Sequence, residues 1–179
     1  MNNAVLIGAS SFLGSRIAEL YNPRICELRF EDSEQYWIDY GEKNADADAV
    51  ILLSRACRKI SPRRDRNTML NEVSGISKIL HAFPNTHFIF ASTKVVYGLT
   101  DDNVQPTSRD SIIEQFSKSV SGELINTVVD FPETSYDEKS LNTLGLEYQI
   151  YAHTKLCAEH LIKYCAKTYT IFRLWDITT

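Results

Sequence analysis

The sequence predicts an α/β fold in which a doubly wound parallel sheet is flanked by helices on both faces. Short apolar runs at residues 4–7, 49–53 and 87–91 alternate along the chain with segments of helical periodicity. Continuous apolar runs of this length are typical of strands that are buried on both faces. The alternation favours parallel pairing, because each helix returns the chain to the same end of the sheet.

In the first third of the chain, a strand is expected at residues 4–7, followed by a small-residue turn and a helix that ends before Pro23. The second and third strands are expected at residues 25–30 and 36–40, which are rich in branched and aromatic side chains. The fourth strand, at residues 49–53, follows so closely that no helix is expected between strands three and four.

The later part of the chain is expected to form a helix, a strand, a long helix and a last strand, at residues 69–80, 87–91, 147–164 and 169–174. Residues 99–135 fit the alternation poorly and are interpreted as an insertion, with one helix surrounded by polar turns. The sequence therefore predicts one domain over residues 1–179, with an insertion at about 99–135.

Composition excludes several classes of partner and location. The net charge of −4 provides no basic surface field for nucleic acid or anionic lipid. No segment approaches the ~20 apolar residues that a membrane span needs, and the N-terminus lacks the features of a secretory signal, so a cytoplasmic location is expected. The cysteines at positions 26, 57, 157 and 165 form no CxxC pair, so no metal site is expected.

The segment from Gly8 to Gly14 lies directly between a predicted strand and a predicted helix, which is the context of a dinucleotide-binding turn. The first glycine permits a tight turn, and the last permits close helix packing, while the helix N-terminus attracts a pyrophosphate. Ser11 stands where a glycine is expected, although its hydroxyl can donate to a phosphate. The alternative is a purely structural turn. The residues expected at the cofactor are Gly8, Ser10, Ser11, Phe12, Leu13 and Gly14.

The end of the second predicted strand leaves the choice between NAD and NADP open. An acidic residue at this place usually binds the ribose hydroxyls of NAD. Arg29 would suit the 2′-phosphate of NADP, whereas Glu31 or Asp32 would suit a free 2′-hydroxyl. An ordinary surface charge is the alternative interpretation of Arg29.

Two further motifs carry candidate catalytic groups. Tyr151 and Lys155 are four residues apart on a predicted helix, so both side chains project from one face. A nearby ammonium stabilises a phenolate, and such a tyrosine can exchange a proton with a sugar hydroxyl while a hydride moves to or from nicotinamide. Ser92 and Thr93 follow a strand at its carboxyl end, where ligands bind in open sheets. A chance surface pair and a polar loop are the alternatives.

The three motifs together resemble those of the extended short-chain dehydrogenases/reductases, which include sugar-nucleotide epimerases and dehydratases. The turn is similar to the family's Gly-x-x-Gly-x-x-Gly, and residues 92–98 are similar to its Ser-Ser/Thr-x-x-Val-Tyr-Gly. Tyr151, Lys155 and Glu159 resemble its Tyr-x-x-x-Lys-x-x-x-Glu. The resemblance implies a Rossmann-like fold, NAD or NADP as cofactor and a nucleotide-sugar substrate.

The resemblance also implies roles for individual residues. Tyr151 would be the catalytic acid/base, Lys155 its activator and a ribose ligand, and Thr93 the substrate-orienting hydroxyl with Ser92 beside it. Further cofactor contacts are implied at three positions, which are Asp39 near the adenine and Ser54 and Arg55 where the family usually has two alanines. Family members often dimerise through the Tyr–Lys helix, so a homodimer is implied as well.

Two functions follow from these observations. The first is NAD(P)-dependent oxidation, reduction, epimerisation or dehydration of a nucleotide sugar, which the intact Tyr151, Lys155 and Thr93 favour. The second is a catalytically weak or inactive dinucleotide-binding module that acts as a sensor or partner subunit, which Ser11 and Arg55 favour. The sequence ends at Thr179, whereas the family continues into a smaller, largely helical part that binds the sugar nucleotide; the chain is either truncated or naturally short.

Overall fold

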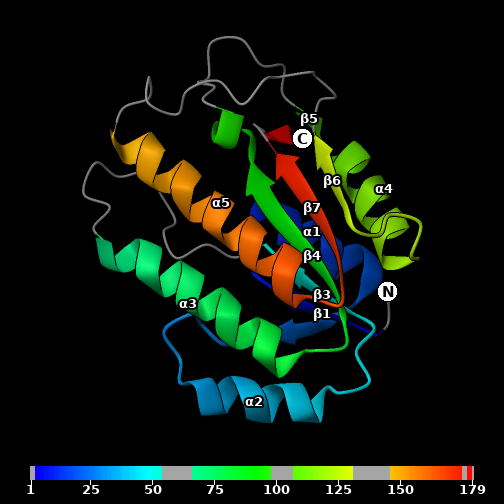
Figure 1. The fold of residues 1–179 in the computed structure, drawn as a ribbon. Coiled ribbons are helices and arrows are strands. Elements are labelled where there is room, and N and C mark those ends of the chain that lie inside the picture. The colour runs from blue at the N-terminus through cyan, green and yellow to red at the C-terminus, as the bar shows by residue number, and fades with distance from the viewer. Residues whose placement is uncertain (1–2, 54–65, 98–106, 131–145, 175–176, 179) are drawn as a thin grey trace.

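A computed structural model describes residues 3–53, 66–97, 107–130, 146–174 and 177–178 of the chain. Six strands form one sheet in the order β2-β1-β3-β4-β7-β6, and every neighbouring pair is parallel (Figure 1). The strands are β1 (Ala4–Ile7), β2 (Arg24–Cys26), β3 (Ala49–Leu52), β4 (His87–Thr93), β6 (Thr127–Asp130) and β7 (Thr168–Leu174). The predicted doubly wound α/β class is therefore confirmed.

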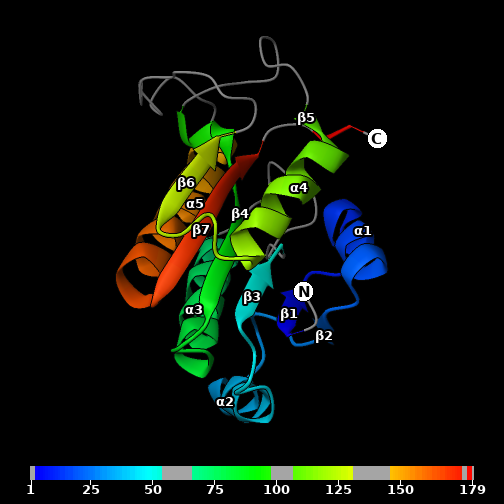
Figure 2. The same cartoon turned by 90° about the vertical axis from the view of Figure 1, so that its right-hand side faces the viewer.

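Helices cover both faces of the sheet, as Figure 2 shows. One face carries α1 (Phe12–Tyr21) and α4 (Arg109–Val120), and the opposite face carries α3 (Arg66–Ala82) and α5 (Leu146–Cys165). The helix α2 (Glu34–Lys43) packs against α3 at the end of the molecule away from the tips of β4 and β7. A short pair of strands, β5 (Thr107–Ser108) and β8 (Ile177–Thr178), lies apart from the main sheet.

The strands are apolar throughout because alternate side chains enter two separate cores. In β1, Val5 and Ile7 belong to the core under α3 and α5, whereas Ala4 and Leu6 belong to the core under α1 and α4. All four side chains are buried. Burying each branched side chain contributes about 1.5 to 3 kcal/mol, so the apolar runs hold the sheet between its two helix layers.

The prediction of a strand at residues 36–40 is wrong, because these residues lie within α2. The Ser33 hydroxyl accepts a hydrogen bond from the Tyr36 backbone N–H and caps the helix. Trp37 and Gly41, one turn apart, form its buried face. A helix therefore does connect the second strand to β3, contrary to the sequence interpretation. The strand β2 is also shorter than predicted and ends at Cys26.

Residues 107–130 form a helix and a strand that continue the strand–helix alternation, and the insertion at about 99–135 stays a prediction. The helix predicted there is confirmed as α4, and its Phe116 ring stacks on Phe172 of β7 at a centroid distance of 4.3 Å. The strand β6, which the sequence did not predict, pairs with β7 at the edge of the main sheet. Within the described ranges, no helix has the length and apolarity required to cross a membrane.

Candidate active site

A cavity of about 280 Å³ lies at the carboxyl ends of β1, β3, β4 and β7. The turn after β1, the hydroxyls at the end of β4 and the Tyr–Lys pair of α5 all contribute residues to its lining. Because β2 and β3 lie on opposite sides of β1, the direction of winding reverses next to this cavity. Ligands bind at such reversal points in open parallel sheets. The residues that line the cavity are Ser11, Phe12, Leu13, Leu53, Ala91, Ser92, Thr93, Tyr151, Lys155 and Leu174.

The turn after β1 has the shape that its glycines impose. Gly8 has a φ of +95°, a conformation that L side chains rarely adopt. A Cβ atom on Gly14 would lie 2.2 Å from the Gly8 carbonyl oxygen, so only glycine fits there. Ser11 caps α1, since its hydroxyl accepts a hydrogen bond from the Gly14 N–H at 3.0 Å. One of the backbone N–H groups at the start of α1 therefore already has a hydrogen-bond acceptor within the chain.

A cation from another part of the chain lies beside this turn. The Arg109 guanidinium carbon is 5.3 Å from the centroid of the Phe12 ring, which lines the cavity. Arg109 is the first residue of α4, so the packing of α4 beside α1 brings it here. Neither spacing nor motif in the sequence predicts this contact.

The two hydroxyls at the end of β4 are buried and oriented differently. The Ser92 hydroxyl donates to the Glu159 carboxylate at 2.6 Å, whereas the Thr93 hydroxyl accepts from the Val95 N–H at 3.3 Å. A hydroxyl has a single proton. Ser92 therefore presents acceptor lone pairs to the cavity, and Thr93 has a proton to donate.

Ser92 is held by a buried cluster of charged and polar groups. Arg173 donates through two nitrogens to the Glu159 carboxylate, at 3.1 and 2.8 Å, and through its third nitrogen to the Tyr97 hydroxyl. Tyr97, in the short 3₁₀ helix Lys94–Tyr97, donates in turn to Asp130 at 2.9 Å. Burial raises the pKa of Tyr97, which keeps the phenol protonated for this bond. The cluster ties α5, β4, β7 and β6 together.

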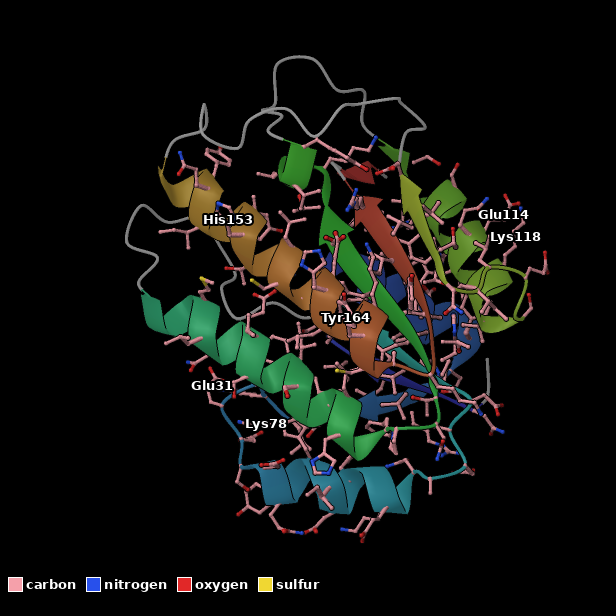
Figure 3. The ribbon with its side chains drawn as sticks, viewed as in Figure 1. Glu31, Lys78, Glu114, Lys118, His153 and Tyr164 are labelled. Carbon is pink, nitrogen blue, oxygen red and sulfur yellow. The ribbon has the colours of Figure 1, made fainter. Side chains whose placement is uncertain are left out.

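Tyr151 and Lys155 lie on the same face of α5 and both line the cavity. The Lys155 ammonium is 5.9 Å from the centroid of the Tyr151 ring and 4.8 Å from that of the Phe90 ring. It donates to the Glu72 carboxylate of α3 at 2.7 Å. His153, between the two in sequence, is exposed on the outer side of α5 (Figure 3).

Other predicted site residues lie away from the cavity or outside the described residues. Asp39 lies on α2, where it accepts a hydrogen bond from Gln35, and the strand that was expected to bring it to an adenine does not form. The Arg29 side chain is exposed beyond the end of β2, and its role stays a prediction. Ser54 and Arg55 lie outside the described residues.

Glu72, which holds the cavity residue Lys155, was not among the residues that the sequence predicted for the site. It shares a buried face of α3 with Ile76 and Ile79, one and two turns further along the helix. An acidic residue among the apolar positions of a helix has to find a cation, because an unpaired buried charge is very unfavourable. That pattern is a usable signal, although it does not identify Lys155 as the partner.

No family model matches the sequence, and no curated protein is similar to it. Solved structures do match. The Bordetella bronchiseptica enzyme WbmH in complex with NAD+ has a TM-score of 0.59 and 16% identity, with coverage of 97% of this chain and 55% of that one. The Brucella ovis UDP-glucose 4-epimerase in complex with NAD has a TM-score of 0.59 and 19% identity, with coverage of 97% and 51%. RMD from Pseudomonas aeruginosa, complexed with NADPH, has a TM-score of 0.54 and 18% identity, with coverage of 95% and 53%.

The chain has a Rossmann-like fold. The match of these NAD- and NADPH-bound structures over 95–97% of the chain, together with its parallel sheet, confirms the fold predicted from the sequence. The chain spans about half the length of the solved structures that it matches.

Proposed function

We propose that this chain is the NAD(P)-binding domain of an epimerase, dehydratase or reductase that acts on a nucleotide sugar, with Tyr151, Lys155 and Thr93 as its active residues. The observation that carries the proposal is a single cavity lined by the turn after β1, the hydroxyls at the end of β4 and the Tyr–Lys pair of α5. The similarity in fold to a UDP-glucose 4-epimerase and to NAD- and NADPH-bound enzymes supports it.

The residues at the two ends of the cavity fit a dinucleotide. At one end, the N-terminus of α1 offers backbone N–H groups and partial positive charge to a pyrophosphate, and Arg109, which also pairs with Asp110 at 3.8 Å, adds a cation beside Phe12. At the other end, Lys155 and the two hydroxyls suit ribose and carboxamide groups. The nicotinamide, when bound, accepts or gives up the hydride.

The chain's own residues then orient the substrate and move a proton. The Thr93 hydroxyl donates to the reacting oxygen of the sugar, and the Tyr151 hydroxyl exchanges a proton with that same oxygen. The Lys155 ammonium, 5.9 Å from the centroid of the Tyr151 ring, places a positive charge beside the reacting hydroxyl. The apolar side chains of Leu13, Leu53 and Leu174 limit access of water to the cavity.

The test is a substrate-dependent change in nicotinamide absorbance, measured over a panel of nucleotide sugars with NAD(H) and NADP(H). Replacing the acid/base with Tyr151→Phe keeps the ring and removes the hydroxyl, so turnover is expected to fall by about 10² to 10⁴. The matched control is His153→Ala, two residues away on the exposed side of α5, which leaves the rate unchanged (Figure 3). A Tyr151→Phe rate equal to the wild-type rate would sink the catalytic assignment.

The second candidate, a dinucleotide-binding module without turnover, is favoured by a specific observation. The Lys155 ammonium is already engaged by Glu72, and the Ser11 hydroxyl engages a helix N–H at the phosphate end. Saturable cofactor binding without turnover on any substrate, and with unchanged binding in Tyr151→Phe, would favour this module. Under the enzyme proposal, Lys155→Met weakens both cofactor binding and turnover.

A further inference from the structure

The ion pair between Glu72 and Lys155 joins α3 to α5 at the wall of the cavity. The two residues are 83 positions apart in the sequence, and the carboxylate and ammonium are 2.7 Å apart. Glu72 is 3% exposed and Lys155 is 2% exposed, so solvent screens neither charge effectively. Lys155 lines the cavity itself, which places the Glu72 charge directly behind the cavity wall.

The surroundings fix the ammonium in one place. It is held by the Glu72 carboxylate and faces the rings of Phe90 and Tyr151, at 4.8 and 5.9 Å from their centroids. On the α3 side, Ile76 and Ile79 continue the buried face on which Glu72 lies. Movement of Glu72 would therefore disturb packed apolar side chains, and the carboxylate stays beside Lys155.

A buried ion pair has a different electrostatic effect from a lone buried ammonium. The negative charge of Glu72 cancels part of the field that Lys155 exerts on a ligand in the cavity. Oxidised nicotinamide carries a positive charge on its ring, and reduced nicotinamide carries none. The two redox forms of a bound cofactor thus respond differently to the charge of Glu72, whereas a purely structural effect would act on both alike.

We propose that Glu72 is a positioning residue of this site, which holds the Lys155 ammonium beside Tyr151 and makes the cavity favour oxidised over reduced nicotinamide. The inference rests on the proposed function, because it requires NAD(P) with its nicotinamide near Lys155. Glu72 would thereby set the ratio of the Kd of the oxidised cofactor to the Kd of the reduced cofactor, and hence the redox potential of the bound cofactor.

The test is calorimetric titration of the oxidised and reduced forms separately, on wild-type chain and Glu72→Gln. Glutamine keeps the length of the side chain and an acceptor oxygen but removes the charge. The ratio of the oxidised to the reduced Kd is expected to rise about tenfold in Glu72→Gln, because the negative charge that favours the positively charged nicotinamide ring is removed. In Glu72→Asp, which keeps the charge, the ratio stays within about twofold of wild type.

Two further variants keep the test decisive if Glu72→Gln does not fold. Lys155→Met removes the positive charge that lines the cavity, so oxidised nicotinamide loses a repulsive neighbour and the ratio is expected to fall below the wild-type value. The double variant Glu72→Leu/Lys155→Met removes a neutral pair, and its ratio is expected to stay near wild type. The control is Glu114→Gln, an exposed acid paired with Lys118 on α4, which leaves the ratio unchanged (Figure 3).

The outcomes separate the two proposals. A wild-type chain that binds neither form contradicts the proposed function and this inference together. A chain that binds both forms, with one ratio across wild type, Glu72→Gln and Lys155→Met, contradicts only the role of Glu72. Opposite shifts of the ratio in the two single variants establish that role.

Discussion

The two ends of the cavity are built in opposite ways. At the phosphate end, seven consecutive residues from Gly8 to Gly14 form the turn, through a positive φ, a close backbone approach and a serine cap. At the Tyr–Lys end, the polar groups are held by partners far away in sequence, such as Glu72 for Lys155 and Glu159 for Ser92. The first end is local and close to the surface, and the second is long-range and buried.

This difference predicts how each end responds to substitution. A hydrogen bond at a helix cap contributes about 1 kcal/mol, so changes at the phosphate end should be graded. Removal of one partner from a buried charge pair costs about 3 to 5 kcal/mol, because the other charge stays buried without compensation. The Tyr–Lys end should therefore be sensitive to single substitutions that the phosphate end tolerates.

The largest effect is expected at Arg173, whose guanidinium holds Glu159 in the buried cluster. Arg173→Met leaves the buried Glu159 carboxylate with Lys163, 3.8 Å away, as its remaining cation, so the free energy of unfolding should fall by about 3 kcal/mol in a denaturant titration, the lower end of the range for a broken buried pair. Arg24→Met is the control, since Arg24 pairs with Asp46 at the surface and its loss should lower the free energy of unfolding much less. Equal losses in both variants would contradict the contrast between buried and exposed pairs.

The second largest effect is expected from a substitution that changes the backbone of the turn at the phosphate end. Gly14→Ala places a Cβ atom 2.2 Å from the Gly8 carbonyl oxygen, so the turn has to shift. The expected loss is about 1 to 3 kcal/mol of stability, accompanied by weaker cofactor binding because the turn moves. Thermal unfolding and calorimetry measure the two effects. Ser15→Ala, at the next and exposed position, should change neither; a Gly14→Ala chain that binds as wild type would refute the importance of this turn.

A smaller effect at the same end separates capping from cofactor binding. Ser11→Ala removes the hydroxyl that accepts from Gly14 and should cost about 1 kcal/mol, whereas Ser11→Gly should cost only a few tenths. Glycine also lets a pyrophosphate approach the backbone more closely, so Ser11→Gly should bind cofactor at least as tightly as wild type. Weaker binding by Ser11→Gly than by Ser11→Ala would show that this interpretation of Ser11 is wrong.

The smallest effect comes from a buried cluster that is polar but uncharged, at the amino end of β4. His87 contacts the hydroxyls of Thr168, Ser119 and Thr170, and burial lowers its pKa below the ordinary value of 6.5. Because the pKa of His87 is lower in the folded than in the unfolded chain, neutral His87 contributes its full stabilisation of the folded state above about pH 6.5. This contribution is lost as the pH falls toward the pKa of the folded state.

The free energy of unfolding should thus decrease by about 0.5 kcal/mol more in wild type than in His87→Gln when the pH falls from about 7 to about 6. Denaturant titrations at several pH values measure this difference. His160→Gln, at an exposed position on α5, should keep the wild-type pH dependence. Parallel curves for wild type and His87→Gln would contradict the assignment to His87.

The same contrast explains what the sequence predicts and what it does not. The continuous apolar runs of β1, β3 and β4, and the Gly8–Gly14 turn, are local patterns that can be read directly. The strand β6 was missed because its side chains are only half-buried at the edge of the sheet. The aromatic residues of α2 were misread as a strand, because aromatic side chains favour strands, although Ser33, Glu34 in the first turn and Lys43 in the last turn are helix signals.

At the candidate site, the sequence identified the groups that line the cavity but not the groups that hold them. Ser92, Thr93, Tyr151 and Lys155 were all expected at the cavity, and the fold brings them to it. Glu72 and Arg109 contact the lining residues Lys155 and Phe12 only through the packing of α3 and α4, which no local pattern records. Contacts between segments that are distant in the sequence depend on tertiary structure, so local sequence patterns do not predict them.

The most direct test of the central claim is a calorimetric titration of the wild-type chain with NAD+, NADH, NADP+ and NADPH, beside the Gly14→Ala variant. The account predicts saturable binding of at least one of these nucleotides in the micromolar range, and weaker binding by Gly14→Ala. The absence of saturable binding to all four, by a chain that is folded, would contradict the assignment of this cavity as a dinucleotide site.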